Sequence, residues 1–288
     1  MKRSFSALIT ALACAGALAT LAGCSGNPVT PAPAAPKGEL KGSAWAHTDA
    51  SRPLVVRQAQ VALPASVTGG TPYLGKWSGV PPVQGKAPVV VFLHGSSGLG
   101  LAAIGDWQKW LASQGWASVA PDSFALADRV TYQSPVGKTT YEKVHALRAS
   151  EITLTADALL DAPWADTRHM VLAGTSEGAV SVARYEGPVF AGRIMYAWSC
   201  EPNYFVETPR NAFGDGTPVL NVISSTDPFF SPTNLWLGNP AAVGHCGPAL
   251  KDHKKASVVL IPGAPHTLLN LPAARAATLG LLAQVLAR

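Results

Sequence analysis

A short apolar run that leads into a Gly-x-Ser-x-Gly motif constrains the fold of this chain more than any other feature. Residues 170–173 have the length and composition of a buried strand, and the residues from Ala179 onward suit a helix. Ser176 would stand on the sharp turn between them, where Gly174 and Gly178 keep side chains away from the neighbouring elements. The free N–H groups at the start of the helix would face any anion formed at the serine. The motif therefore predicts a nucleophile elbow.

The rest of the chain alternates apolar runs with helical patterns. Further strands are expected at 89–93, 116–120, 193–198, 218–223 and 257–261, and helices at 104–111, at 141–160 and from residue 272 onward. The stretch from Leu54 to Pro64 has the alternation of an edge strand, and 125–140 is expected as an irregular loop over the site. This order predicts an α/β fold, a mostly parallel central sheet with helices on both faces. Ligands bind beyond the carboxyl ends of such strands.

The composition suits one large α/β domain. The chain has 288 residues, 48% of them hydrophobic and 14% charged, with a formal net charge of +5. Its densest basic cluster, Lys251 with Lys254 and Lys255, is typical of a solvated loop, so no nucleic-acid partner is expected. No group of His, Cys and Asp has ligand spacing, and His245 next to Cys246 cannot form a site alone, so no metal is expected.

The N-terminal residues are expected to be an export signal. In residues 1–23 a positively charged start precedes an apolar run at 5–21. The sequence Leu21-Ala22-Gly23-Cys24 resembles a bacterial lipobox, which implies cleavage before Cys24 and acylation of that cysteine. The alternatives are an ordinary signal peptide that is cut elsewhere and an uncleaved anchor.

A lipid anchor at Cys24 would hold the protein to a membrane in the cell envelope, because several acyl chains bind far more tightly than one. Ser25 after the cysteine favours the outer membrane if the cell is Gram-negative. Residues 24–50 are rich in proline and alanine and are expected to form a tether, and residues 51–288 the folded domain.

The cysteines predict one disulfide. Removal of the signal takes Cys14 away and lipid would occupy Cys24, which leaves Cys200 and Cys246. In an oxidising compartment this pair should be bonded, for a stabilisation of about 4 kcal/mol. Two unpaired buried thiols are the alternative.

Two other loops leave strand ends with residues that suit nucleophilic catalysis. Asp227 follows the strand expected at 218–223, and His266 follows the strand expected at 257–261. Ser176 would attack a carbonyl, His266 would take and return the proton, and Asp227 would hold the imidazole tautomer. Asp252 and Asp215 are the fallback candidates for the acid.

The stabilisation of an oxyanion would need two backbone donors. The first should be the N–H of Glu177, directly after the nucleophile, and the second should come from the loop after the strand expected at 89–93. In that loop Ser96 is the first choice and Ser97 the next. His94 is expected to brace the loop rather than to take part in chemistry.

Together these motifs resemble one family. The segments His94-Gly95-Ser96-Ser97-Gly98, Pro121-Asp122-Ser123-Phe124 and Gly174-Thr175-Ser176-Glu177-Gly178, with Asp227 and His266, resemble the dienelactone hydrolase-like branch of the α/β-hydrolase superfamily. The resemblance covers about residues 54–288 and implies hydrolysis of esters or lactones without a metal or organic cofactor.

Two features depart from the family. The dienelactone hydrolases have a cysteine nucleophile, so Ser176 favours the serine esterase relatives. The interval from Asp227 to His266 is long, and a Cys200–Cys246 bond would pin this insertion beside the site. Four aromatic residues near predicted strand ends are candidates for a substrate pocket: Phe124, Trp198, Tyr204 and Phe229.

Two other function classes compete with that of a serine ester hydrolase. Gly95, Gly98 and Gly100 after a strand loosely imitate a dinucleotide-binding loop, but their spacing does not match Gly-x-Gly-x-x-Gly. A catalytically inactive binding lipoprotein of the cell envelope with the hydrolase fold is the main alternative. The intact set of serine, aspartate and histidine favours the enzyme, acting on a small-molecule ester.

Overall fold

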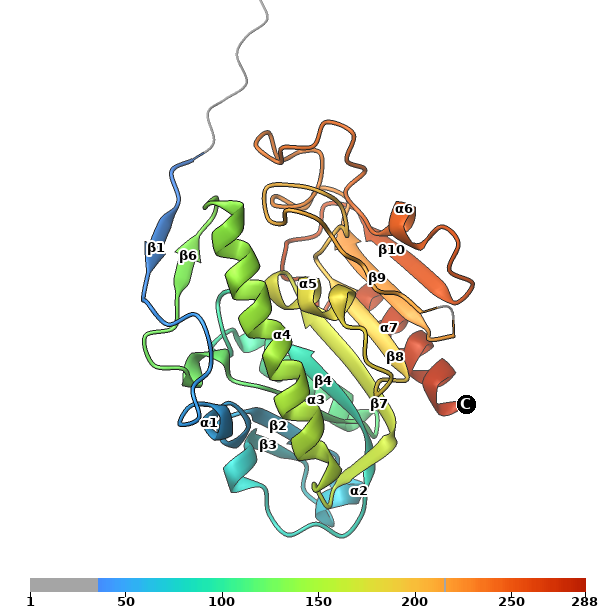
Figure 1. Cartoon of the computed structure of the whole chain (residues 1–288). Helices are drawn as coiled ribbons and strands as arrows, with labels where there is room; N and C mark the ends of the chain where they lie inside the picture. The colour runs from blue at the N-terminus through green and yellow to red at the C-terminus, as the bar shows by residue number, and fades with distance from the viewer. Residues whose placement is uncertain (1–35, 215) are drawn as a thin grey trace, which may run out of the picture. The chain divides into compact units, whose positions relative to one another are not determined.

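One large, mostly parallel sheet organises the chain. The computed structural model describes residues 36–214 and 216–288, and its main sheet has eight strands in the order β10-β9-β8-β7-β4-β5-β2-β3 (Figure 1). Their bounds are β2 Gln60–Leu63, β3 Tyr73–Lys76, β4 Ala87–Leu93, β5 Ala117–Ala120, β7 Ala165–Thr175, β8 Gly192–Tyr196, β9 Val219–Ser224 and β10 Ala256–Ile261. The strands from β10 to β5 pair in parallel, and β2 is antiparallel to both of its neighbours. The predicted mostly parallel sheet is confirmed.

Helices cover both faces of the sheet, as predicted. The helices are α1 Arg52–Arg57, α2 Ala65–Thr68, α3 Ala102–Ser113, α4 Lys138–Leu160, α5 Glu177–Arg184, α6 Gly247–Leu250 and α7 Pro272–Leu286, with 3-10 turns at η1 Trp77–Gly79 and η2 Ser123–Ala125. Figure 1 shows α4 crossing the face of the sheet where α5 also lies, and α7 on the opposite face. The apolar residues of α3 and α7 pack together in the core on that opposite face.

The central strands read as continuous apolar runs because both of their faces are buried. In β4 the side chains of Val89, Val91 and Leu93 join the core under α4 and α5. Those of Val90 and Phe92 join the core under α3 and α7. The period of two along the strand therefore divides one apolar run between two cores.

The prediction of an edge strand between Leu54 and Pro64 is wrong for the first half of that stretch. Residues 52–57 form α1, with Pro53 in the first turn, where a missing N–H costs no hydrogen bond. Only Gln60–Leu63 is extended, and this strand lies between β5 and β3 instead of at the edge of the sheet.

The folded unit extends on the N-terminal side of residue 51. Strand β1, Glu39–Lys41, pairs antiparallel with β6, Thr131–Gln133, in a separate sheet of two strands (Figure 1). Residues 39–41 were expected in the tether, and 131–133 in an irregular loop; the local sequences carry no period long enough to predict either strand.

The expected signal peptide at 1–23, the lipid site at Cys24 and the fallback acid Asp215 lie outside the described residues. The lipid anchor and the envelope location therefore stay predictions from the sequence. Within residues 36–214 and 216–288, no helix has the length and apolar character needed to cross a bilayer.

Candidate active site

Ser176 stands on a strained turn between β7 and α5. Its backbone has φ 52° and ψ −117°, a conformation that residues with a side chain rarely adopt. A Cβ on Gly174 would lie 2.8 Å from the backbone of Gly178, and a Cβ on Gly178 would meet the carbonyl oxygen of Leu93. These close approaches are why the turn requires glycine at both positions, and the strand–turn–helix geometry of an elbow is present as predicted.

Asp227 and His266 come together at the carboxyl ends of β9 and β10. His266 Nδ1 lies 2.7 Å from Asp227 Oδ2, and the Asp227 side chain is fully buried. Because a carboxylate only accepts hydrogen bonds, Nδ1 carries the proton and Nε2 of the neutral ring is free to accept one. The other oxygen, Oδ1, accepts the N–H groups of Phe229 and Phe230, which hold the carboxylate in place.

The predicted nucleophile and base line the same space. Ser96, Ser97, Ser176 and His266 all line both a cavity of about 140 Å³ and a neighbouring one of about 50 Å³. In the part of the chain that the structure describes, no hydrogen bond joins Ser176 Oγ to His266. In enzymes, the bond between nucleophile and base is often long without substrate and shortens when substrate binds.

Two backbone N–H groups beside Ser176 are free to bind an anion. The N–H of Glu177 begins α5, and Ser96 lies in the loop after β4. Among the described residues neither N–H donates to a protein acceptor outside its own helix or strand. Ser96 therefore carries an available donor at the cavity, and Glu177 carries one directly after Ser176, a residue that lines it.

The larger cavity has aromatic walls. Its lining, besides the serines at 96, 97 and 176, consists of Tyr132, Ser134, Tyr204, Phe205, Phe229, Phe230 and His266. Of the four aromatic residues proposed from the sequence, Tyr204 and Phe229 line it. Trp198 is fully buried in the core, and Phe124 is 39% exposed and stacks on His94.

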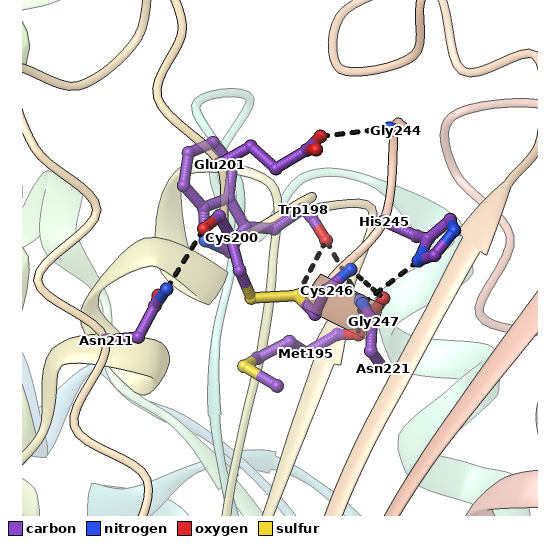
Figure 2. Close-up of a disulfide and its surroundings, with 10 residues drawn as sticks. All are labelled: Met195, Trp198, Cys200, Glu201, Asn211, Asn221, Gly244, His245, Cys246 and Gly247. Carbon is purple, nitrogen blue, oxygen red and sulfur yellow. Dashed lines mark hydrogen bonds between the residues drawn. A yellow bond between two sulfur atoms is a disulfide. The ribbon is translucent and has the colours of Figure 1, made fainter. Parts of the chain in front are cut away.

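A disulfide joins the two loops that supply these walls. Cys200 and Cys246 are bonded, as predicted, with 4.8 Å between their Cα atoms (Figure 2). The bond ties the loop that carries Tyr204 and Phe205 to the insertion that begins with Phe229 and Phe230. Glu201 accepts hydrogen bonds from the insertion, at the N–H groups of Val243 and Gly244. Figure 2 shows the second of them.

Comparison with solved structures gives many neighbours of this shape. A protein from Klebsiella pneumoniae described as a dienelactone hydrolase has a TM-score of 0.52 and 16% identity, over 78% of this chain and 99% of that one. Est1E from Butyrivibrio proteoclasticus with bound ferulic acid has a TM-score of 0.50 and 16% identity, over 80% and 95%. A dienelactone hydrolase-like phosphotriesterase from metagenomic libraries has a TM-score of 0.50 and 16% identity, over 80% and 97%.

The chain has the α/β-hydrolase fold. Its structural neighbours are dienelactone hydrolase-like and esterase structures, the branch that the motifs resemble. No protein-family profile and no curated protein sequence matches it.

Behind the elbow of this hydrolase fold lies a buried network of charges that no pattern in the sequence indicated. Glu177 Oε1 accepts a hydrogen bond of 2.6 Å from Arg129, and Oε2 accepts one of 2.7 Å from the hydroxyl of Tyr132. Arg148 pairs with Glu151 at 2.8 Å and lies 3.5 Å from Glu177. The side chains of these two arginines and two glutamates are at most 1% exposed. Two arginines thus balance two carboxylates.

His94 braces the loop that follows β4 and carries Ser96, as expected from the sequence. Its Nδ1 donates to the carbonyl of Gly95, and its Nε2 accepts from Ser123 N–H and from Arg148. Burial, and next the charge of Arg148, hold the pKa of His94 well below its ordinary value. The neutral ring therefore links the loop to the charge network.

Acid is expected to destabilise the protein through its buried histidines. Burial lowers the pKa of His145 to about 4, and the pKa of His94 is lowered as well. Unfolding frees both rings to bind a proton below about pH 6.5, so the unfolded chain binds more protons in that range. Above about pH 6.5 these histidines do not lower the free energy of unfolding. As the pH falls from there towards the folded pKa values, each histidine lowers it by about 1.4 kcal/mol per pH unit.

Urea unfolding at pH 7, 6 and 5 measures this loss. The variant His145→Gln should lose less free energy of unfolding between pH 7 and pH 5 than the wild type. His253→Gln, at a surface position, should keep the wild-type pH dependence. An equal pH dependence in His145→Gln and the wild type would show that His145 does not contribute.

Proposed function

We propose that this protein is a serine hydrolase that cleaves carboxylic esters or lactones through an acyl-enzyme intermediate. One observation carries the proposal: Ser176 and His266 line one cavity, and His266 is held by a buried aspartate at 2.7 Å. A strained serine at a helix start, a neutral imidazole with a free Nε2 and two available N–H donors are the parts that acyl transfer needs. The likeness to hydrolase structures supports the same class of reaction.

The reaction follows from these atoms. Ser176 Oγ attacks the carbonyl carbon of the ester while His266 Nε2 takes its proton. The imidazolium, stabilised by Asp227, then gives that proton to the departing alcohol, and an acyl group stays on the serine. A water molecule attacks the acyl-enzyme, His266 takes a proton from it and returns it to Ser176, and the acid leaves.

The negative oxygen formed in each step needs fixed donors. The N–H groups of Glu177 and Ser96 are the candidates, because Ser96 lines the cavity and Glu177 follows Ser176 at the positive end of α5. Removing one such donor costs about 10²–10³ in rate in comparable sites.

The cavity favours a small substrate. At about 140 Å³ it is smaller than the roughly 300–1,000 Å³ of pockets that bind drug-sized ligands. Tyr204, Phe205, Phe229 and Phe230 give it flat apolar walls, which suit a short acyl chain or an aromatic ring. The similar structure of Est1E holds ferulic acid, which contains an aromatic ring.

A fluorophosphonate probe is expected to label the protein at Ser176. Peptide mapping locates the label, and p-nitrophenyl esters of two, four and eight acyl carbons test turnover and pocket size. Acetate and butyrate esters should be cleaved with a higher kcat/KM than the octanoate ester, because the walls restrict acyl length. Ser176→Ala should lose both the label and turnover, while Ser181→Ala, a buried hydroxyl on α5 bonded to the carbonyl of residue 145, should keep the label.

Absence of label and of turnover in folded protein would contradict the proposal. That result would favour the alternative, a binding lipoprotein with the hydrolase fold and no catalysis. A label at a serine other than Ser176 would contradict the assignment of the nucleophile.

A further inference from the structure

The N-terminal segment 38–47, here called the strap, lies along the loop 123–134, here called the wall loop. Strand β1 of the strap pairs with β6 of the wall loop, Leu40 opposite Tyr132. Further along, the N–H groups of Ser43 and Ala44 donate to the carbonyl of Asp128, at 3.0 and 2.9 Å. The strap therefore follows the wall loop through a continuous series of backbone hydrogen bonds.

The wall loop depends on the strap for its position. Among the described residues β6 pairs with no strand other than β1, and it has only three residues. A strand that short is not stable without a partner. Gly38 lies so close to the wall loop that a Cβ there would meet the carbonyl oxygens of Gln133, at 2.5 Å, and Pro135.

The inner side of the wall loop holds Glu177. Arg129 donates to one oxygen of its carboxylate and Tyr132 to the other, at 2.6 and 2.7 Å. The ring of Tyr132 also lines the cavity that Ser176 lines. One face of the wall loop thus contacts the strap, and the other contacts the residue that follows the nucleophile.

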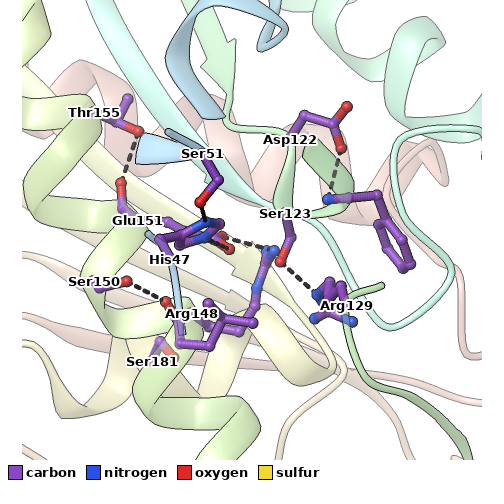
Figure 3. A network of polar contacts seen from close by, with 12 residues as sticks. His47, Ser51, Asp122, Ser123, Arg129, Arg148, Ser150, Glu151, Thr155 and Ser181 are labelled. Carbon is purple, nitrogen blue, oxygen red and sulfur yellow. Dashed lines mark hydrogen bonds and ion pairs between the residues drawn. The ribbon is translucent and has the colours of Figure 1, made fainter. Parts of the chain in front are cut away.

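The far end of the strap reaches the same network from another side. His47 Nε2 lies 3.1 Å from Glu151, whose carboxylate pairs with Arg148, as Figure 3 shows. Arg148 in turn donates to the carbonyl of His94 at 2.9 Å, at the start of the loop that carries Ser96. Both ends of the strap therefore connect to the two loops that would supply the oxyanion donors.

We propose that the strap is part of the active site: it holds the wall loop so that Tyr132 and Arg129 position Glu177 and the N–H group that follows the nucleophile. This inference rests on the proposed function, because it assigns the Glu177 N–H to the oxyanion. Tyr132 is a positioning residue that acts through Glu177. Donors misplaced by a fraction of an ångström lose much of their effect on the transition state and little of their effect on substrate binding.

The test uses the full chain with two variants that act at opposite ends of this series of contacts. Tyr132→Phe removes only the hydroxyl on Glu177, and Gly38→Ala places a Cβ against the wall loop without touching the cavity. Each should lower kcat for p-nitrophenyl acetate about tenfold, with KM changed by less than about twofold. Gly280→Ala is the matched control, because a Cβ there meets nothing within 4 Å, and it should keep the wild-type kcat.

The double variant tests whether the two changes share one path. If they do, Gly38→Ala combined with Tyr132→Phe should lose little more than the worse single variant. A full multiplication of the two losses would overturn the proposal, and so would a folded Gly38→Ala with wild-type kcat. A change confined to KM would make Tyr132 a wall of the cavity only.

Amide hydrogen exchange gives a readout that does not need activity. In Gly38→Ala the exchange of the peptides that contain β6 and the start of α5 should rise, while that of β8 and β9 stays unchanged. Unchanged exchange at the start of α5 would overturn the role of the strap even if the wild type proved inactive. Inactivity of the wild type with the expected exchange pattern would count against the proposed function alone.

Discussion

Replacing Asp227 by asparagine is expected to lower kcat about 10⁴-fold while the protein stays folded. The Oδ1 atom accepts two backbone N–H groups, and an asparagine carbonyl oxygen would take its place. The amide NH₂ would then point at His266 Nδ1, where the carboxylate now accepts a hydrogen bond. Nδ1 would have to be the unprotonated nitrogen, so Nε2 would carry the proton and could not take one from Ser176.

The matched control is Asp252→Asn. Asp252 is the fallback acid from the sequence, and its side chain is 89% exposed at the surface. Steady-state hydrolysis of p-nitrophenyl acetate should be unchanged in this variant, and circular dichroism should report a native fold for both. Wild-type activity in Asp227→Asn, or a large loss in Asp252→Asn, would show that the acid has been assigned to the wrong residue.

The second large effect is expected on stability. Glu177→Gln should lower the free energy of unfolding by about 3–5 kcal/mol, because it removes one partner from a buried ion pair. Arg129 at 2.6 Å and Arg148 at 3.5 Å would both lose a carboxylate, and Glu151 alone would balance two buried guanidinium groups. Water cannot compensate, because these side chains are almost completely inaccessible.

Urea unfolding at pH 7 measures this loss, and Glu142→Gln is its control. Glu142 also pairs with two arginines, Arg184 and Arg210, but nearer the surface, where the Arg210 side chain is 62% exposed. Burial alone would raise the pKa of Glu142, but the hydrogen bonds from Arg184 and from the N–H of Glu207 lower it to about 2, so it is ionised at pH 7. Its replacement should also lower the free energy of unfolding, but by less than that of Glu177, because water can reach the arginine that loses its partner. Equal losses in the two variants would contradict the importance of burial.

The parts of the site that could be predicted from the sequence depend on neighbours in the chain. The elbow needs an apolar strand, Gly174, Gly178 and a helix within about a dozen residues, and the close approaches that require these glycines are local. Asp227 and His266 could be placed because each directly follows a strand, and parallel strands bring their carboxyl ends to one edge. Their contact at 2.7 Å was expected from that rule.

The loop residues could not be predicted in the same way. Tyr132 and Arg129 lie in a stretch without a helical or strand period longer than three residues, and their partner Glu177 is more than forty positions away. Among the aromatic candidates, Trp198 is buried in the core and Tyr204 lines the cavity, although both follow the same strand. The path of the loop after that strand, which the disulfide helps to set, decides whether a side chain enters the core or the cavity.

The sequence by itself determined the α/β class, the elbow and the order of serine, aspartate and histidine, because local periodicity and turn chemistry suffice for them. Only the tertiary structure decided that residues 38–47 belong to the folded unit and that Glu177 is the centre of a buried charge network. Backbone pairing between distant segments and the balance of buried charges both depend on distances through space. Spacing along the chain does not encode those distances.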